Sequence, residues 1–218
     1  MTPADPRLAL RTGLNRALMH PLAKPAWVLL ALWPLALLIW GAIQGGLGAN
    51  PAETLIRSTG DWALRLLCLG LSITPLRVSL GLPALARFRR NTGVLCFVYA
   101  ACHVLAYMGL DMGWQLADIW HDVLKRPFIT VGMATFGLLL PLALTSFNRA
   151  VRALGGRRWQ RLHRLVYLAA ALALLHFLWM RSGKQLFGEV WLYGGWLALV
   201  LLWRVRAAWH KRRAAVRV

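Results

Sequence analysis

Two histidines, His103 and His176, lie deep within long apolar segments of the sequence. An ionisable side chain in the hydrocarbon of a membrane is costly, so each one marks a candidate functional site. His103 follows Gly93 by ten residues, about 15 Å along a helix, and His176 follows His163 by thirteen residues, about 20 Å. If both segments cross the membrane from the cytoplasm outward, the two imidazoles lie together in its outer half.

Two imidazoles at similar depth, without carboxylates or thiolates around them, suit the two axial positions of a haem iron. Zinc would need four ligands. We therefore predict that His103 and His176 ligate one haem iron. An open alternative is that each imidazole only hydrogen-bonds a hydroxyl or carbonyl group of a neighbouring helix. Tyr107 lies one turn after His103 and is a further candidate cofactor contact.

A third histidine, His163, begins the segment that contains His176, at its expected cytoplasmic boundary. Thirteen residues rotate a helix by about 220°, so these two histidines do not share an ideal helix face. The residue thirteen positions before His103 is Arg90, which cannot ligate iron but can pair with a haem propionate or a flavin phosphate. His163 is thus either an iron ligand or cofactor contact near the inner face, or an ordinary interfacial histidine.

Arginines surround His163 in the sequence, among them Arg157, Arg158 and Arg164. With Arg90, they are candidates to hold propionates, a flavin phosphate or the acidic surface of an electron donor. The simpler explanation for each one is a topology signal, because Lys and Arg concentrate in cytoplasmic loops.

Other kinds of site find little support in the sequence. Cys68, Cys96 and Cys102 form no CxxC pair, and there is no CxxCH motif, which argues against a disulfide framework, a thiolate metal site and covalently attached haem. GxGxxG, Walker A and HExxH motifs are also lacking. Arg65 follows Asp61 by four residues, which predicts either an ion pair on one helix face or an arginine side chain that extends to the membrane interface.

The composition indicates that lipid surrounds these residues. Of 218 residues, 59% are hydrophobic and 15% are charged, whereas soluble domains have roughly 25% charged residues. Six stretches approach the ~20 residues that a membrane crossing needs. These stretches are 26–44, 62–81, 93–112, 127–147, 163–181 and 187–204. The sequence therefore predicts an all-α integral membrane protein with six transmembrane helices.

The charge is strongly basic, with 26 Lys and Arg against 7 Asp and Glu and a formal net charge of +19. The bases lie mostly in short segments between apolar runs, which indicates membrane topology rather than nucleic acid binding. By the positive-inside rule both termini are cytoplasmic. We expect a basic arm over 1–25, a six-helix haem-binding domain over 26–204 and a basic tail over 205–218.

Two polar stretches are too polar to cross the membrane and are predicted to be interfacial helices on its outer side. They span 51–59 and 113–124, and in the second stretch Trp114, Ile119 and Trp120 recur at helical spacing.

An ordered series of motifs resembles a known family over about residues 26–204. The motifs are Gly45 to Pro51, Ile73 to Arg77, Arg89-Arg90 with Gly93, His103 with Tyr107, Lys125 to Pro127, Leu144 to Ser146, and Trp159 with Leu162 to Tyr167. The chain resembles the haem-binding membrane subunit of the bacterial periplasmic methionine sulfoxide reductase system, the MsrQ or YedZ family. That family belongs to the wider ferric-reductase-like transmembrane group.

The resemblance implies a ferric-reductase-like helix bundle in the bacterial inner membrane that binds one or two haem b groups. It implies electron transfer to a periplasmic molybdopterin subunit that reduces methionine sulfoxide in oxidised envelope proteins. It also implies that His103, His163 and His176 are the haem-associated histidines, and it allows flavin mononucleotide (FMN) as a further cofactor. The wider group usually has two histidines on each of two helices, and Arg90 occupies the position of the fourth.

The leading hypothesis is an electron-transfer subunit that does not act on methionine sulfoxide by itself. The alternative is a ferric-reductase-like or other transmembrane electron-transfer haem protein with a different partner. A self-contained ferric or flavin-linked reductase would need a soluble nicotinamide domain of over about a hundred further residues. A transporter would show broken helices or paired intramembrane charges. Membrane quinol and a cytosolic flavin reductase are both candidate electron donors.

Overall fold

The computed structural model describes residues 6–182, 185 and 187–216, so residues 1–5 of the expected arm and 217–218 of the expected tail lie outside the described residues. Regular secondary structure in the described residues is entirely helical, which confirms the all-α prediction. The elements are α1 Pro6–Met19, α2 Ala23–Ile43, α3 Pro51–Leu80, η1 Pro83–Phe88, α4 Arg89–Ala106, η2 Tyr107–Asp111, α5 Leu116–Lys125, α6 Pro127–Leu144, α7 Asn148–Leu154, α8 Gly156–His163, α9 Leu165–Ser182 and α10 Gly188–Val216.

Five helical segments in the described residues are long and apolar enough to cross a membrane: Ala23–Ile43, Pro51–Leu80, Pro83–Asp111, Pro127–Leu144 and Gly156–Ser182. Each contains most of one predicted crossing. The sixth predicted crossing, 187–204, lies in α10, which is not one of the five. Its 29 residues include Glu189 in the first turn and Arg204 further along, which lower its apolar character.

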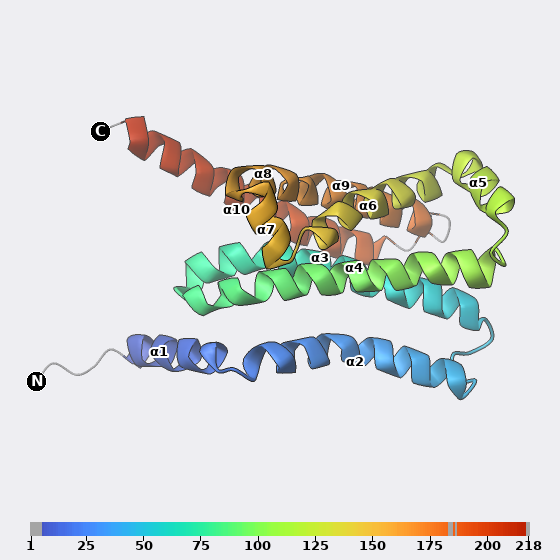
Figure 1. Cartoon of the computed structure of the whole chain (residues 1–218), viewed down its shortest axis with the longest axis horizontal. Coiled ribbons are helices and arrows are strands. Elements are labelled where there is room, and N and C mark those ends of the chain that lie inside the picture. The colour runs from blue at the N-terminus through green and yellow to red at the C-terminus, as the bar shows by residue number, and fades with distance from the viewer. Residues whose placement is uncertain (1–5, 183–184, 186, 217–218) are drawn as a thin grey trace, which may run out of the picture.

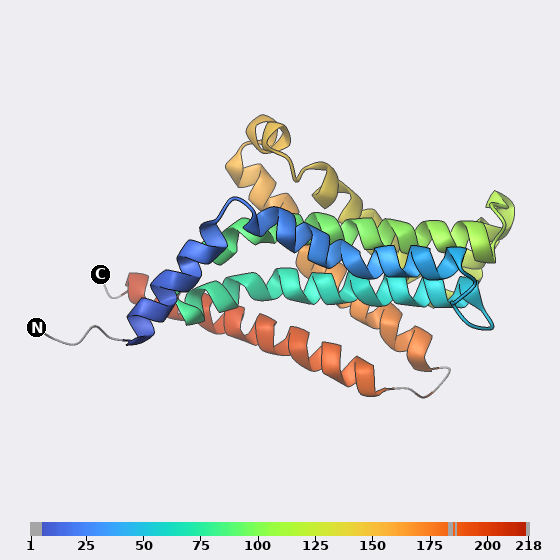
Figure 2. The same cartoon turned by 90° about the horizontal axis from the view of Figure 1, so that it is seen from below.

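The helices α2, α3 and α4, labelled in Figure 1, run nearly parallel to one axis, and α9 and α10 are inclined to it (Figure 2). The most extensive packing joins α3 to α4 and α6 to α9, and α10 packs against α3 and α9. In both views α1 and the C-terminal end of α10 lie at the same end of the bundle. The opposite end carries α5 and the start of α3.

A buried tyrosine fixes α2 against α4. Tyr99 is fully buried, and its hydroxyl donates to the Ala31 carbonyl (2.7 Å) and accepts from the Leu35 N–H (3.0 Å). These two groups would normally bond each other in a helix, so the hydroxyl is inserted into the hydrogen-bond ladder of α2 beside Pro34. Tyr99 therefore fixes the register between the two helices together with Trp27, whose Nε1 donates to the Thr92 hydroxyl (3.2 Å).

The helix α3 runs without a break from Pro51 to Leu80, so the separate interfacial helix predicted over 51–59 is wrong. Pro51 lies in the first turn, and the Asn50 side chain accepts a hydrogen bond from the Glu53 N–H (3.1 Å). Both features are typical of a helix start. The consequence for the site is that Ile56 and Gly60 belong to a rigid helix.

The second polar stretch forms α5, as the helical spacing predicts, with Ile119 and Asp122 buried. The predicted ion pair between Asp61 and Arg65 is wrong. Arg65 instead donates from Nε to the Tyr193 hydroxyl (2.9 Å), and Asp61 pairs with Arg181 (3.3 Å). Helical spacing allowed the pair, but contacts from α9 and α10 determine the partners.

Candidate functional site

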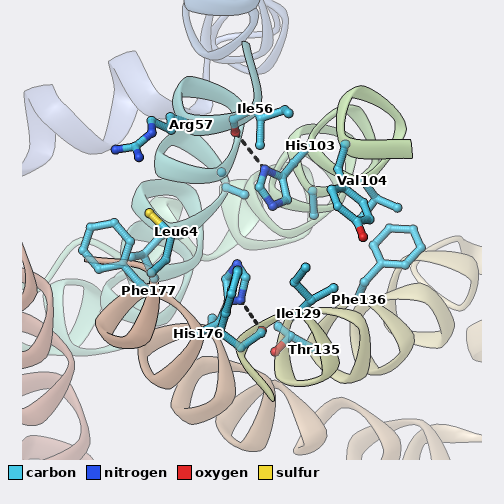
Figure 3. Close-up of a pocket in the computed structure, with 18 of the residues that line it drawn as sticks. Ile56, Arg57, Leu64, His103, Val104, Ile129, Thr135, Phe136, His176 and Phe177 are labelled. Carbon is cyan, nitrogen blue, oxygen red and sulfur yellow. Dashed lines mark hydrogen bonds between the residues drawn. The ribbon is translucent and has the colours of Figure 1, made fainter. Parts of the chain in front are cut away.

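The two membrane-embedded histidines come together inside the bundle. His103 projects from α4 and His176 from α9, and their ring centroids are 6.1 Å apart with the ring planes at 76° (Figure 3). Two imidazoles on opposite sides of one metal ion, each bonded at about 2 Å, have ring centres about 6 Å apart. The observed separation therefore fits a single iron between the rings.

Each imidazole is oriented by a backbone carbonyl of a neighbouring helix. His103 Nδ1 bonds the Ile56 oxygen of α3 (2.8 Å), and His176 Nδ1 bonds the Phe128 oxygen of α6 (2.6 Å). A carbonyl only accepts, so Nδ1 carries the proton in both rings. Nε2 then keeps its lone pair, which is the arrangement of a metal-ligating histidine held by an outer hydrogen bond.

A glycine opposite each ring makes these close contacts possible. A Cβ on Gly60 would lie 3.0 Å from His103 Nδ1, and a Cβ on Gly132 would lie 2.8 Å from His176 Cε1. Gly60 follows Ile56 by four residues, and Gly132 follows Phe128 by four. Since residues four apart share a helix face, α3 and α6 each present a carbonyl and a glycine to one histidine in the same way.

The histidines line a cavity of ≈ 460 Å³ between α3, α4, α6 and α9. Its volume lies within the range of roughly 300–1,000 Å³ that is usual for cofactor sites. Its walls are mainly apolar, and the ends of α3 and α6 add polar side chains. In the part of the chain that the structure describes, no three His, Cys, Asp or Glu side chains are grouped closely enough to hold a metal ion. Glu53, Asp61 and Asp111 also line the cavity, so the expectation that no carboxylates surround the two imidazoles is wrong.

Tyr107 also lines this cavity, as the sequence predicts for a cofactor contact. Its hydroxyl donates to Asp122 Oδ2 (2.7 Å), and the other oxygen of Asp122 pairs with Arg126 Nε (2.7 Å). The Asp122 side chain is 9% exposed. Tyr107 therefore belongs to a polar network at the edge of the cavity.

A second cavity of ≈ 560 Å³ brings together three of the other predicted residues, Arg90, His163 and Arg164. Arg89 and Arg204 line it as well. Arg157 and Arg158 are exposed on α8 and are not among the residues that line either cavity. Two of the four predicted arginines therefore line the second cavity, and the other two lie on an exposed part of α8.

The surroundings of His163 differ from those of the other two histidines. Its Nε2 lies 3.1 Å from the Thr145 hydroxyl, and its ring stacks on Trp159 at a centroid distance of 4.0 Å. Arg90 donates to the Ser146 carbonyl and to Asn148 Oδ1, so its side chain is held on the loop after α6. Iron ligation by His163 Nε2 would require the contact with Thr145 to open.

Sequence reasoning missed three features of these cavities. Gly132 gives a signal, since it interrupts an apolar run, whereas Gly60 lies in a polar stretch between Thr59 and Asp61. Nothing in the sequence says which ring faces either glycine. Arg204 ends the sixth predicted crossing and has no role in the sequence analysis, yet it donates to the Tyr167 hydroxyl (2.8 Å) and the Leu71 carbonyl (2.7 Å) and lines the second cavity.

Comparison with known proteins places the site in a family. Residues 59–174 match the family model described as "Ferric reductase like transmembrane component". The chain is 52% identical over 208 residues to a protein of Polaromonas naphthalenivorans, covering 95% of each chain. It is 46% identical over 191 residues to one of Herminiimonas arsenicoxydans, covering 88% of each, and 47% identical over 182 residues to one of Caulobacter vibrioides, covering 84% of each. All three relatives are named "Protein-methionine-sulfoxide reductase heme-binding subunit MsrQ". The chain belongs to the MsrQ family.

Proposed function

We propose that the chain is the haem-binding membrane subunit of a methionine sulfoxide reductase system, in which His103 and His176 are the axial ligands of one haem b. The observation that carries this proposal is the pair of imidazoles 6.1 Å apart, each held through Nδ1 by a backbone carbonyl. Bound haem would supply a one-electron redox centre. The names of the relatives support a haem-binding subunit of such a system.

The protein itself would orient the two imidazole rings and exclude water from the cavity. Ile56 and Phe128 fix the tautomer and direction of the two rings, so Nε2 of each is available to a metal without a change of rotamer. Leu64, Phe136 and Phe177 are among the apolar side chains that line the cavity. A low-polarity cavity of this kind influences the redox potential of a bound metal centre.

The second cavity is proposed as the place where electrons enter. It shares Leu67 and Leu139 with the first cavity, so the two are separated by single side chains. Four arginines and His163 line it, and no carboxylate is among its lining residues. We propose that it holds a second haem or FMN, with Arg90 and Arg164 as partners of an anionic group and His163 as ligand or contact. Quinol and a cytosolic flavin reductase both fit as donors.

The membrane arrangement is proposed as six crossings of the bacterial inner membrane with both termini cytoplasmic. The placement of α1 and the end of α10 at one end of the bundle supports an even number of crossings (Figure 2). The five apolar helices and the basic segments near that end support the orientation. The cavity with His103 and His176 then faces the periplasm, where the partner would be a molybdopterin-containing reductase subunit.

A second candidate function is favoured by the family model, whose description names ferric reductases. In that case the same haem site would deliver electrons to a different acceptor. The partner distinguishes the two functions, because the cavities are common to both.

The test is reduction and reoxidation of the purified protein in detergent or liposomes. Reduced flavin or quinol should give the spectrum of a reduced b-type haem, and addition of the molybdopterin subunit with a methionine sulfoxide substrate should reoxidise it. Reoxidation should require both the partner and the substrate. Haem that stays reduced in the presence of an active partner and substrate would contradict the proposed role and favour another acceptor.

A further inference from the structure

The cavity between His103 and His176 has two cations among its lining residues, Arg57 and Arg126. Arg57 follows Ile56, whose carbonyl holds His103, and Arg126 lies two residues before Phe128, whose carbonyl holds His176. Both arginines therefore lie at the same end of the cavity, near the start of α3 and α6. Figure 3 shows Arg57 on α3, with its guanidinium directed away from the two histidine rings and toward the margin of the site.

Each guanidinium is anchored by a carboxylate one helical turn earlier. Arg57 Nε pairs with Glu53 Oε1 (2.7 Å), and Arg126 Nε pairs with Asp122 Oδ1 (2.7 Å). Asp122 is fixed in turn by the Tyr107 hydroxyl. In both arginines the carboxylate lies at hydrogen-bond distance from Nε.

A guanidinium that is fixed through Nε presents its two terminal nitrogens as a planar fork, which matches the two oxygens of a carboxylate. Two such forks at one end of a largely apolar cavity fit a flat ligand with two carboxylates on one edge. The half-buried Arg57 and the more exposed Arg126 keep contact with solvent, so bound carboxylates would stay hydrated at this end.

We infer that Arg57 and Arg126 bind the two propionate carboxylates of the haem between His103 and His176, and that the propionate edge faces the end of the bundle with α5. This inference depends on the proposed haem site. Glu53, Asp122 and Tyr107 are positioning residues, because they act through the arginines. Each arginine charge favours the reduced state of the haem, so loss of either one lowers the redox potential, while the carboxylates of Glu53, Asp61 and Asp111, which also line the cavity, act in the opposite direction.

The test measures haem loss and redox potential in the full-length haem-loaded protein. The rate of haem transfer to excess apomyoglobin should rise about ten- to a hundredfold in Arg57→Gln and Arg126→Gln, the size expected for a lost charge-assisted hydrogen bond. The midpoint potential should fall in both variants. Arg152→Gln makes the same charge change on exposed α7 and should match wild type.

Haem dimethyl ester separates a direct contact from a folding effect. In protein reconstituted with this ester, the Arg→Gln variants should lose haem at the wild-type rate, because the carboxylates are blocked. Equal haem loss in the variants and in wild type with ordinary haem would overturn the inference, and so would an arginine effect that persists with the ester. Wild-type protein that binds no haem would overturn the proposed function itself, which is a different result.

Discussion

Gly132 of α6 lies directly against the imidazole of His176, so that a Cβ at this position would be 2.8 Å from the ring. The same helix bonds the His176 Nδ1 through the Phe128 carbonyl one turn earlier. One turn of α6 thus determines both how close the ring lies and which nitrogen it presents. Gly60 and Ile56 have the same relation to His103 on α3.

Replacing Gly132 by Ala should displace the His176 ring and weaken haem binding. Overpacking at a rigid contact costs about 1–3 kcal/mol, which corresponds to about tenfold or more in affinity. Haem content per protein and the reduced absorption spectrum measure the effect. Gly137→Ala is the matched control in the same helix, because a Cβ there meets no atom within 4 Å. If both variants retain wild-type haem content and spectrum, the close contact does not matter for the site.

Replacing His163 by Ala should slow reduction by the donor while the haem between His103 and His176 keeps its spectrum. The physical reason is that His163 lines the second cavity and contacts Thr145 and Trp159 rather than the first cavity. Stopped-flow reduction with reduced flavin or quinol measures the rate, and His121→Ala, at an exposed position of α5, serves as the control. An unchanged rate, or loss of the whole haem spectrum, would argue against this division of roles.

Replacing Arg181 by Met should destabilise the bundle. Arg181 is 9% exposed and pairs with Asp61 (3.3 Å) and Glu189 (2.6 Å), which joins α9 to α3 and α10. Removing one partner leaves the partly buried Asp61 carboxylate uncompensated, at a cost of about 3 kcal/mol. Thermal unfolding in detergent should show a clearly lower midpoint than for Arg152→Met, which changes an exposed arginine. Equal midpoints would show that the ion pairs contribute little.

The six-crossing topology predicts where reporter enzymes are active. Alkaline phosphatase, which is active in the periplasm, should be inactive when fused after the C-terminal residue and active when inserted after Gly113, before α5. A green fluorescent protein fusion should give the reverse pattern. Phosphatase activity at the C-terminus would mean that α10 does not cross, or that the orientation is inverted.

Hydropathy and depth along the helices predicted much of the arrangement. Five predicted crossings match apolar helices, because ~20 apolar residues have few alternatives to a membrane span. The equal depth of His103 and His176 along their helices predicts that the two side chains lie together, and in the structure their rings are adjacent. That reasoning works because two helices that cross in the same direction bring residues of equal depth to the same level.

Lateral contacts were not predictable from one sequence. The hydropathy of a helix does not say which neighbour it faces, so Asp61 was matched to Arg65 rather than to Arg181 on α9. Arg57, in the predicted interfacial helix 51–59, and Arg126, just before the fourth predicted crossing, have no role in the sequence analysis, although both line the histidine cavity. The sequence predicts a separate helix for the polar start of α3 because the composition changes from polar to apolar along it. The backbone nevertheless continues as one helix.

The most direct test of the account is the ferric EPR spectrum of the purified protein and of its two single-histidine variants. Wild type should give a highly anisotropic low-spin signal, because the planes of the two proposed axial imidazoles lie at 76°. His103→Ala and His176→Ala should each lose that signal, through conversion to high spin or loss of the haem. Retention of the wild-type low-spin signal at full haem content in both variants would contradict the claim that these two histidines ligate one iron.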